Sequence, residues 1–88
     1  MIVRILGEGH FEVPEADMPA IEQLDAELTD ALDRGDEPAF ESALADVVGQ
    51  IRHTGVLLPP DDLQPSGLVV PHPGSTLAEV RELLAEGS

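Results

Sequence analysis

The stretch Arg34-Gly35-Asp36-Glu37-Pro38-Ala39-Phe40 decides the fold, because it can end one helix and begin another within a few residues. Gly35 can adopt the left-handed conformation that ends many helices. Asp36 can cap the next helix through its side-chain oxygen, and Pro38 falls in the first turn, where its missing N–H is not needed. Two helices joined so closely are expected to form an antiparallel hairpin.

Before this connection, apolar residues recur at helical spacing and predict a helix from Met18 to Arg34. Asp17 is the expected N-cap of this helix, and Pro19 suits its first turn. The apolar residues fall within an arc of about 100° on one face. They are Ile21, Leu24, Leu28, Ala31 and Leu32.

After the connection, a second amphipathic helix is expected to begin at Asp36 and to end at Gly55. Its apolar stripe consists of Phe40, Ala43, Leu44, Val47, Val48 and Ile51. An apolar stripe is unfavourable in water. We therefore expect the two helices to face each other, a sheet or a partner.

The N-terminal segment predicts a β-hairpin. Residues 2–6 are mostly β-branched and apolar, and Gly7-Glu8-Gly9 has the chemistry of a turn. His10-Phe11-Glu12-Val13 then alternates with a period of two, which places His10 and Glu12 on the solvent face. Pro14 ends the second strand.

The C-terminal third predicts a loop, a strand and a helix. Residues 56–67 are rich in proline and are expected to form an ordered loop, and Leu68-Val69-Val70 is expected to be a short buried strand. Thr76 and Glu79 have the spacing of a capping box. The apolar stripe of the helix that follows is Leu77, Val80, Leu83 and Leu84.

The order β-β-α-α-β-α predicts a single α+β domain over residues 1–88. A short sheet, made of the N-terminal hairpin and one C-terminal strand, is expected to pack against the helical hairpin and the C-terminal helix.

The chain is strongly acidic: 18 Asp and Glu residues face four arginines, and the formal net charge is −14. This sign repels phosphate backbones and anionic lipids, so we expect neither nucleic-acid binding nor direct docking on a membrane. The charge suits a basic protein surface, although solubility or the codon bias of a GC-rich genome explains the same composition. There is no long apolar run and no signal-peptide pattern, so we expect a cytoplasmic protein.

Residues that could carry chemistry do not combine into a recognised site. His10, His53 and His72 fall in three different elements, and no pair shows metal-ligand spacing. We expect Asp61-Asp62, in the proline-rich loop, to form a turn rather than a cation site. The chain has no cysteine and no nucleophile-elbow serine. We therefore expect no catalytic residues, no cofactor and no metal.

Glu22, Asp30 and Asp33 lie away from the apolar stripe of the first helix and form the candidate protein-binding surface. The apolar stripes could extend onto a coiled-coil partner, or the core of the domain itself could use them fully. A chain of this length has a thin core, so self-association into a homodimer is the alternative to a heterologous partner.

Several of these motifs together resemble the PspA-associated (PspAA) family. They are residues 1–14, residues 34–40, Leu58-Pro59-Pro60-Asp61-Asp62-Leu63, residues 65–71 and Thr76-Leu77-Ala78-Glu79-Val80. The resemblance implies a non-catalytic adaptor that associates with PspA, an ESCRT-III-like coiled-coil protein that stabilises stressed membranes. It implies recruitment to the inner face of the membrane only through that partner, and it assigns no functional residues.

Overall fold

The computed structural model describes residues 1–61 and 64–86. Its elements are β1 (Ile2–Ile5), β2 (Gly9–Glu12), η1 (Glu15–Asp17), α1 (Met18–Arg34), α2 (Glu37–Thr54), β3 (Val56–Leu57), β4 (Leu68–Val70) and α3 (Leu77–Glu86). The α+β class and the order of the predicted elements are confirmed. The short helical turn η1 and the two-residue strand β3 were not predicted.

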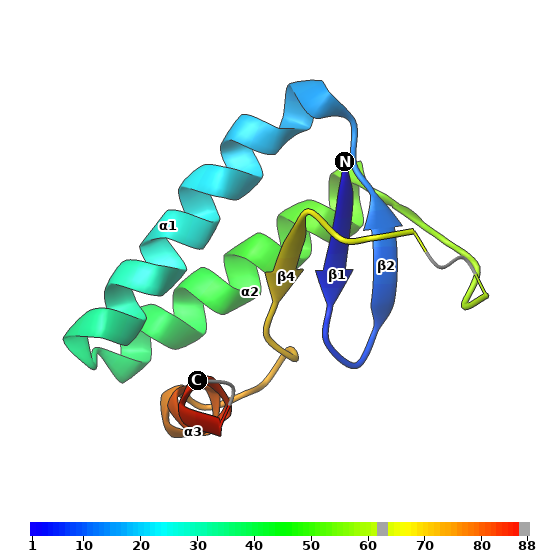
Figure 1. Ribbon diagram of the computed structural model, residues 1–88. Helices are drawn as coiled ribbons and strands as arrows, with labels where there is room; N and C mark the ends of the chain where they lie inside the picture. The colour runs from blue at the N-terminus through cyan, green and yellow to red at the C-terminus, as the bar shows by residue number, and fades with distance from the viewer. Residues whose placement is uncertain (62–63, 87–88) are drawn as a thin grey trace.

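The strands form one open sheet in the order β3-β2-β1-β4, and α2 crosses behind it (Figure 1). β1 pairs antiparallel with β2 through the predicted hairpin and parallel with β4, which lies at one edge of the sheet. α1 runs antiparallel beside α2, and α3 lies near the α1–α2 connection (Figure 1). The predicted helical hairpin is therefore confirmed.

One face of the sheet lies in the core and the other faces solvent, because side chains alternate along a strand. Val3 and Ile5 are fully buried, whereas Arg4 between them is exposed. Other large, fully buried side chains are Val13, Ile21, Phe40, Val47, Ile51 and Val70. The core thus fills the space between the sheet and the helical hairpin.

The connection between α1 and α2 has the predicted geometry. Gly35 is left-handed, with φ 69°, and Asp36 N–H donates to the Ala31 carbonyl at 3.0 Å. The side chain of Asp36 accepts a hydrogen bond of 3.2 Å from the N–H of Ala39. The backbone groups at the end of α1 and at the start of α2 therefore find hydrogen-bond partners within a few residues. This explains why the sequence predicts the positions of both helix ends well.

Asp17 occupies the predicted N-cap position of α1, but the expected hydrogen bond of its side chain does not form. Asp17 is the last residue of η1 and already has helical dihedral angles, φ −93° and ψ −11°. The chain enters α1 from a continuing helical turn, whereas a capping residue needs an extended conformation.

β3 lies in the stretch that was expected to be a loop. It pairs antiparallel with β2, with Leu57 opposite Phe11. This pairing joins segments far apart in sequence, and two residues are too few for a periodic pattern. Asp61 lies in a turn, as expected, while Asp62 lies outside the described residues.

α3 begins as predicted, because Thr76 Oγ1 accepts a hydrogen bond of 3.1 Å from Glu79 N–H. Its apolar stripe, however, is buried only near its start. Leu77 and Val80 are buried, but Leu83 and Leu84 are 54% and 59% exposed. The second half of α3 therefore leaves two leucines largely in solvent.

Candidate functional site

Of the three carboxylates predicted to bind a partner, Asp30 and Asp33 line different hollows. Asp33 lines a groove beside α3, whereas Asp30 lines a hollow on the α2 side. Asp30 is also held by Arg34, whose Nε donates to its Oδ2 at 3.0 Å. Glu22 is exposed and lies about three turns before Asp33, on the same side of the helix. Asp30 and Asp33 therefore face different surroundings, although all three carboxylates lie on the exposed side of α1.

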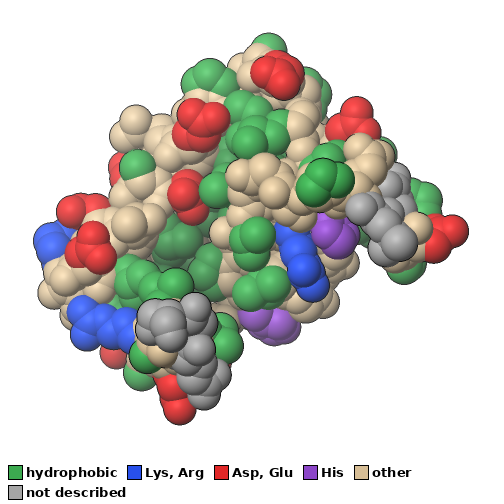
Figure 2. Space-filling view, viewed as in Figure 1, with side chains coloured by type: hydrophobic (Ala, Val, Ile, Leu, Met, Phe, Trp, Pro, Cys, Tyr) green, Lys and Arg blue, Asp and Glu red, His purple; other side chains and the backbone are tan. Residues whose placement is uncertain are grey.

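The groove beside Asp33 lies between α1, β4 and α3, and we name it the α1–α3 groove. It has a volume of about 320 Å³. Its apolar lining includes Leu28, Leu32, Phe40, Val69, Val80 and Leu84. Asp25, Thr29 and Asp33 line it from α1. Figure 2 shows this apolar hollow between α1 and α3, with acidic side chains along α1.

Asp25 is partly withdrawn from water in this groove. Burial raises the pKa of its carboxyl above the ordinary value of 3.8. No arginine or histidine among the described residues forms an ion pair with Asp25 or Asp33. The carboxylate of Asp25 therefore loses hydration without gaining a counter-ion.

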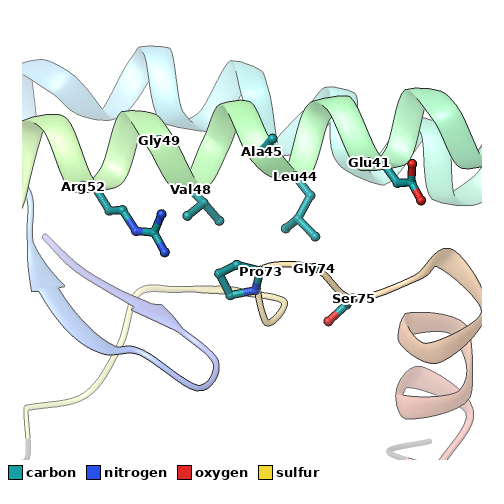
Figure 3. A pocket seen from close by; sticks show the side chains of 9 residues that line it. All are labelled: Glu41, Leu44, Ala45, Val48, Gly49, Arg52, Pro73, Gly74 and Ser75. Carbon is teal, nitrogen blue, oxygen red and sulfur yellow. The ribbon is translucent and has the colours of Figure 1, made fainter.

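A second hollow, of about 400 Å³, lies between α2 and the turn Pro73-Gly74-Ser75. Figure 3 shows Leu44 and Val48 pointing from α2 toward this turn, with Glu41 at one end and Arg52 at the other. We name it the α2 hollow. Its two ends therefore carry side chains of opposite charge.

Arg52 fastens the β1–β2 turn to α2. Its Nε donates to Oε1 of Glu8 at 3.0 Å, and its Nη2 contacts the other carboxylate oxygen. The hydrogen bonding of Arg52 to the Glu8 carboxylate, which accepts from it, raises the pKa of Arg52. The positive charge at this end of the α2 hollow is therefore already neutralised by the protein itself.

The histidines lie in separate places. His10 is on β2, His53 is in the last turn of α2, and His72 begins a turn in which its carbonyl accepts a hydrogen bond from Ser75 N–H at 3.0 Å. Within residues 1–61 and 64–86, no three His, Asp or Glu side chains gather where they could hold a metal ion. No helix in the same part of the chain has both the length and the apolar character needed to cross a membrane.

The fold and its surface define a small acidic α+β domain with apolar hollows, among them the α1–α3 groove and the α2 hollow. The model of the PspA-associated protein family matches the whole chain, residues 1–88, so the chain belongs to the PspAA family. This confirms the resemblance seen in the motifs. The family is described by its association with a protein, PspA, rather than by a reaction. Neither the curated proteins nor the solved structures include a significant match.

Sequence patterns did not predict the α1–α3 groove. Val69 and Leu84 come from elements that are distant from α1 in the chain, so no local signal connects them with Asp33. Asp25 does have a local signal, because it follows Leu24 directly and precedes Leu28 by three positions. An acidic residue beside an apolar stripe is a candidate for partial burial.

Proposed function

We propose that this protein is a non-catalytic adaptor that binds a PspA-type coiled-coil protein in the response to membrane stress. The match of the whole chain to the PspA-associated family carries this proposal. The protein acts in the cytoplasm, at the inner face of the membrane, and contacts the membrane only through its partner. The net charge of −14 supports indirect contact, because it opposes anionic lipids.

The surface supports protein binding. The α1–α3 groove and the α2 hollow are both concave and largely apolar, as contact sites in proteins commonly are. Exposed carboxylates of α1, among them Glu22 and Asp33, add an acidic rim to one side of the molecule. Such a surface is complementary to a helical protein with basic segments.

Size-exclusion chromatography of the protein mixed with its cognate PspA at micromolar concentrations tests the proposal. Co-elution supports it, and independent migration of the two proteins contradicts it. An electrostatic contribution predicts that added salt weakens the complex. The triple variant E22R/D30R/D33R should then lose binding. Unchanged binding of that variant would contradict an electrostatic contribution to the complex.

Single reversals separate the two sides of α1. Asp33→Arg changes the side that faces the α1–α3 groove, whereas Asp30→Arg changes the side that faces α2. If the groove side carries the contact, Asp33→Arg should weaken the complex more than Asp30→Arg. The opposite order would place the contact on the α2 side.

Self-association is the competing function. The exposed residues Val56 and Leu57 form an edge strand, and edge strands can pair with a second copy. Light scattering on the isolated protein measures this directly. A stable dimer that does not bind PspA would favour the competing function.

A further inference from the structure

The α1–α3 groove has apolar walls that the chain itself leaves open. Val69 on β4 and Leu84 on α3 are 52% and 59% exposed, and both line the groove. Phe40 beneath them is fully buried. Apolar side chains arranged around a concave surface gain free energy when a partner removes them from water. The groove is therefore shaped to receive an apolar ligand.

The backbone around the groove favours a helix over an added strand as that ligand. β4 is an edge strand of three residues, and it ends directly before Pro71. Proline has no N–H to donate, so an additional strand would find only a short hydrogen-bonding edge. A helix needs no backbone partners from the groove, because its own hydrogen bonds are internal.

The charge of the groove favours a cationic ligand. Asp25 and Asp33 line it, and neither forms an ion pair with a described residue. The partly buried carboxylate of Asp25 lacks a counter-ion, so a cation brought by the ligand would offset its lost hydration. Cations along the edge of an apolar stripe that faces α1 would meet these two carboxylates.

A second copy of this chain does not have this chemistry. Of the four arginines, Arg34 and Arg52 are engaged in ion pairs, and Arg81 donates to a backbone carbonyl of α1. Arg4, the remaining one, lies on β1 beside Val69 and does not belong to a helix. A net charge of −14 on each copy also opposes self-association. The complementary helix must therefore come from a different protein.

We propose that the α1–α3 groove receives the apolar face of a lysine- or arginine-rich amphipathic helix. Leucine-sized side chains of that helix pack on Val69 and Leu84, and its flanking cations pair with Asp25 and Asp33. The inference rests on the proposed function for the identity of the protein that carries the helix.

Two neighbouring leucines of α3 provide a matched pair of variants. Leu84→Lys removes an apolar contact from the groove and places a cation against the basic helix. Leu83→Lys makes the same change at a residue of similar exposure, 54%, that does not line the groove. We expect Leu84→Lys to weaken the affinity for cognate PspA about tenfold or more, and Leu83→Lys to change it less than about threefold.

Val69→Lys repeats the test from a different element. Circular dichroism checks that each variant retains its helices, which the exposure of all three positions favours. Equal effects of Leu84→Lys and Leu83→Lys would overturn the inference. So would wild-type affinity in both Leu84→Lys and Val69→Lys.

A synthetic helix of leucine and lysine at helical spacing separates the groove from the identity of the partner. In an NMR titration of the full chain, this peptide should shift the amide signals of the groove residues. Leu84→Lys should weaken the binding of the peptide, whereas Leu83→Lys should leave it unchanged. A leucine–glutamate peptide of the same pattern should not bind.

If PspA does not bind but the lysine peptide occupies the groove, the proposed function fails and the groove inference stands. If PspA binds Leu84→Lys as tightly as the wild type and the peptide leaves the groove unshifted, only the groove inference fails; if neither probe binds, both fail.

Discussion

The guanidinium of Arg81 in α3 donates a hydrogen bond of 2.9 Å from Nη2 to the backbone carbonyl of Leu32 in the last turn of α1. The N–H of Gly35 donates to the same carbonyl at 3.2 Å. A cation is favourable at this end of a helix, where the carbonyl groups carry partial negative charge. The contact joins two walls of the α1–α3 groove and helps to position α3, which buries few apolar side chains.

Arg81→Met should loosen α3 from α1, because it removes the hydrogen bond and keeps most of the aliphatic stem. We expect the free energy of unfolding to fall by about 0.5–1.5 kcal/mol, as measured by urea denaturation. Faster amide hydrogen exchange in α3 should accompany this loss. Arg4→Met is the control, since it removes the same charge from an exposed arginine of β1. Equal losses in the two variants would contradict a specific role of the Arg81 contact.

Gly49 within α2 and Gly55, the residue that follows α2, should respond to alanine in opposite directions. A Cβ on Gly55 would lie 2.8 Å from the Ile51 carbonyl oxygen and 3.2 Å from Phe11 Cβ, so α2 would have to move away from β2. We expect Gly55→Ala to destabilise the protein by about 1–3 kcal/mol. A Cβ on Gly49 meets nothing within 4 Å, and Gly49→Ala should stabilise α2 by about 0.5–1 kcal/mol. Thermal unfolding compares the two variants, and equal melting temperatures would refute the close approach.

Removing the cap of α2 should weaken the helical hairpin. Asp36→Ala deletes the acceptor for the N–H of Ala39, and we expect a loss of about 0.5–2 kcal/mol in urea denaturation. Asp36→Asn keeps a side-chain oxygen at this position, so it should retain most of the stability. If both variants lose the same amount, the charge of Asp36 matters more than its cap.

Asp25→Asn should raise the melting temperature at about pH 7 and leave it unchanged at about pH 3. Burial raises the pKa of Asp25 in the folded state above its ordinary value of 3.8. Below the ordinary pKa, the carboxyl is protonated in both the folded and the unfolded protein, so its burial does not lower the free energy of unfolding. As the pH rises through the raised pKa, the folded protein must hold a poorly hydrated carboxylate and loses stability. Asp46→Asn, on the exposed face of α2, controls for the lower net charge, and an equal gain from that variant would contradict the role of burial.

The bounds of the helices follow from the sequence because their causes are local. Gly35 takes the left-handed conformation, Asp36 accepts from Ala39, and Thr76 accepts from Glu79, all within a few residues along the chain. The alternation of Val3, Arg4 and Ile5 likewise determines which face of β1 is buried. The side-chain hydrogen bond expected at Asp17 did not form, because an unexpected helical turn precedes α1.

The sequence by itself therefore determined the three α-helices, the strands β1, β2 and β4, the acidic composition and the PspAA resemblance, because periodicity, caps and charge are properties of short segments. Only the tertiary structure decided which side chains meet. It placed Asp30 and Asp33 in different hollows, left Leu84 exposed while it buried Val80, and lined the α1–α3 groove with residues of α1, α2, β4 and α3. Helical periodicity places Val80 and Leu84 in the same apolar stripe of α3 and does not distinguish between them. Their different burial arises because the second half of α3 extends beyond the core that α1, α2 and β4 provide.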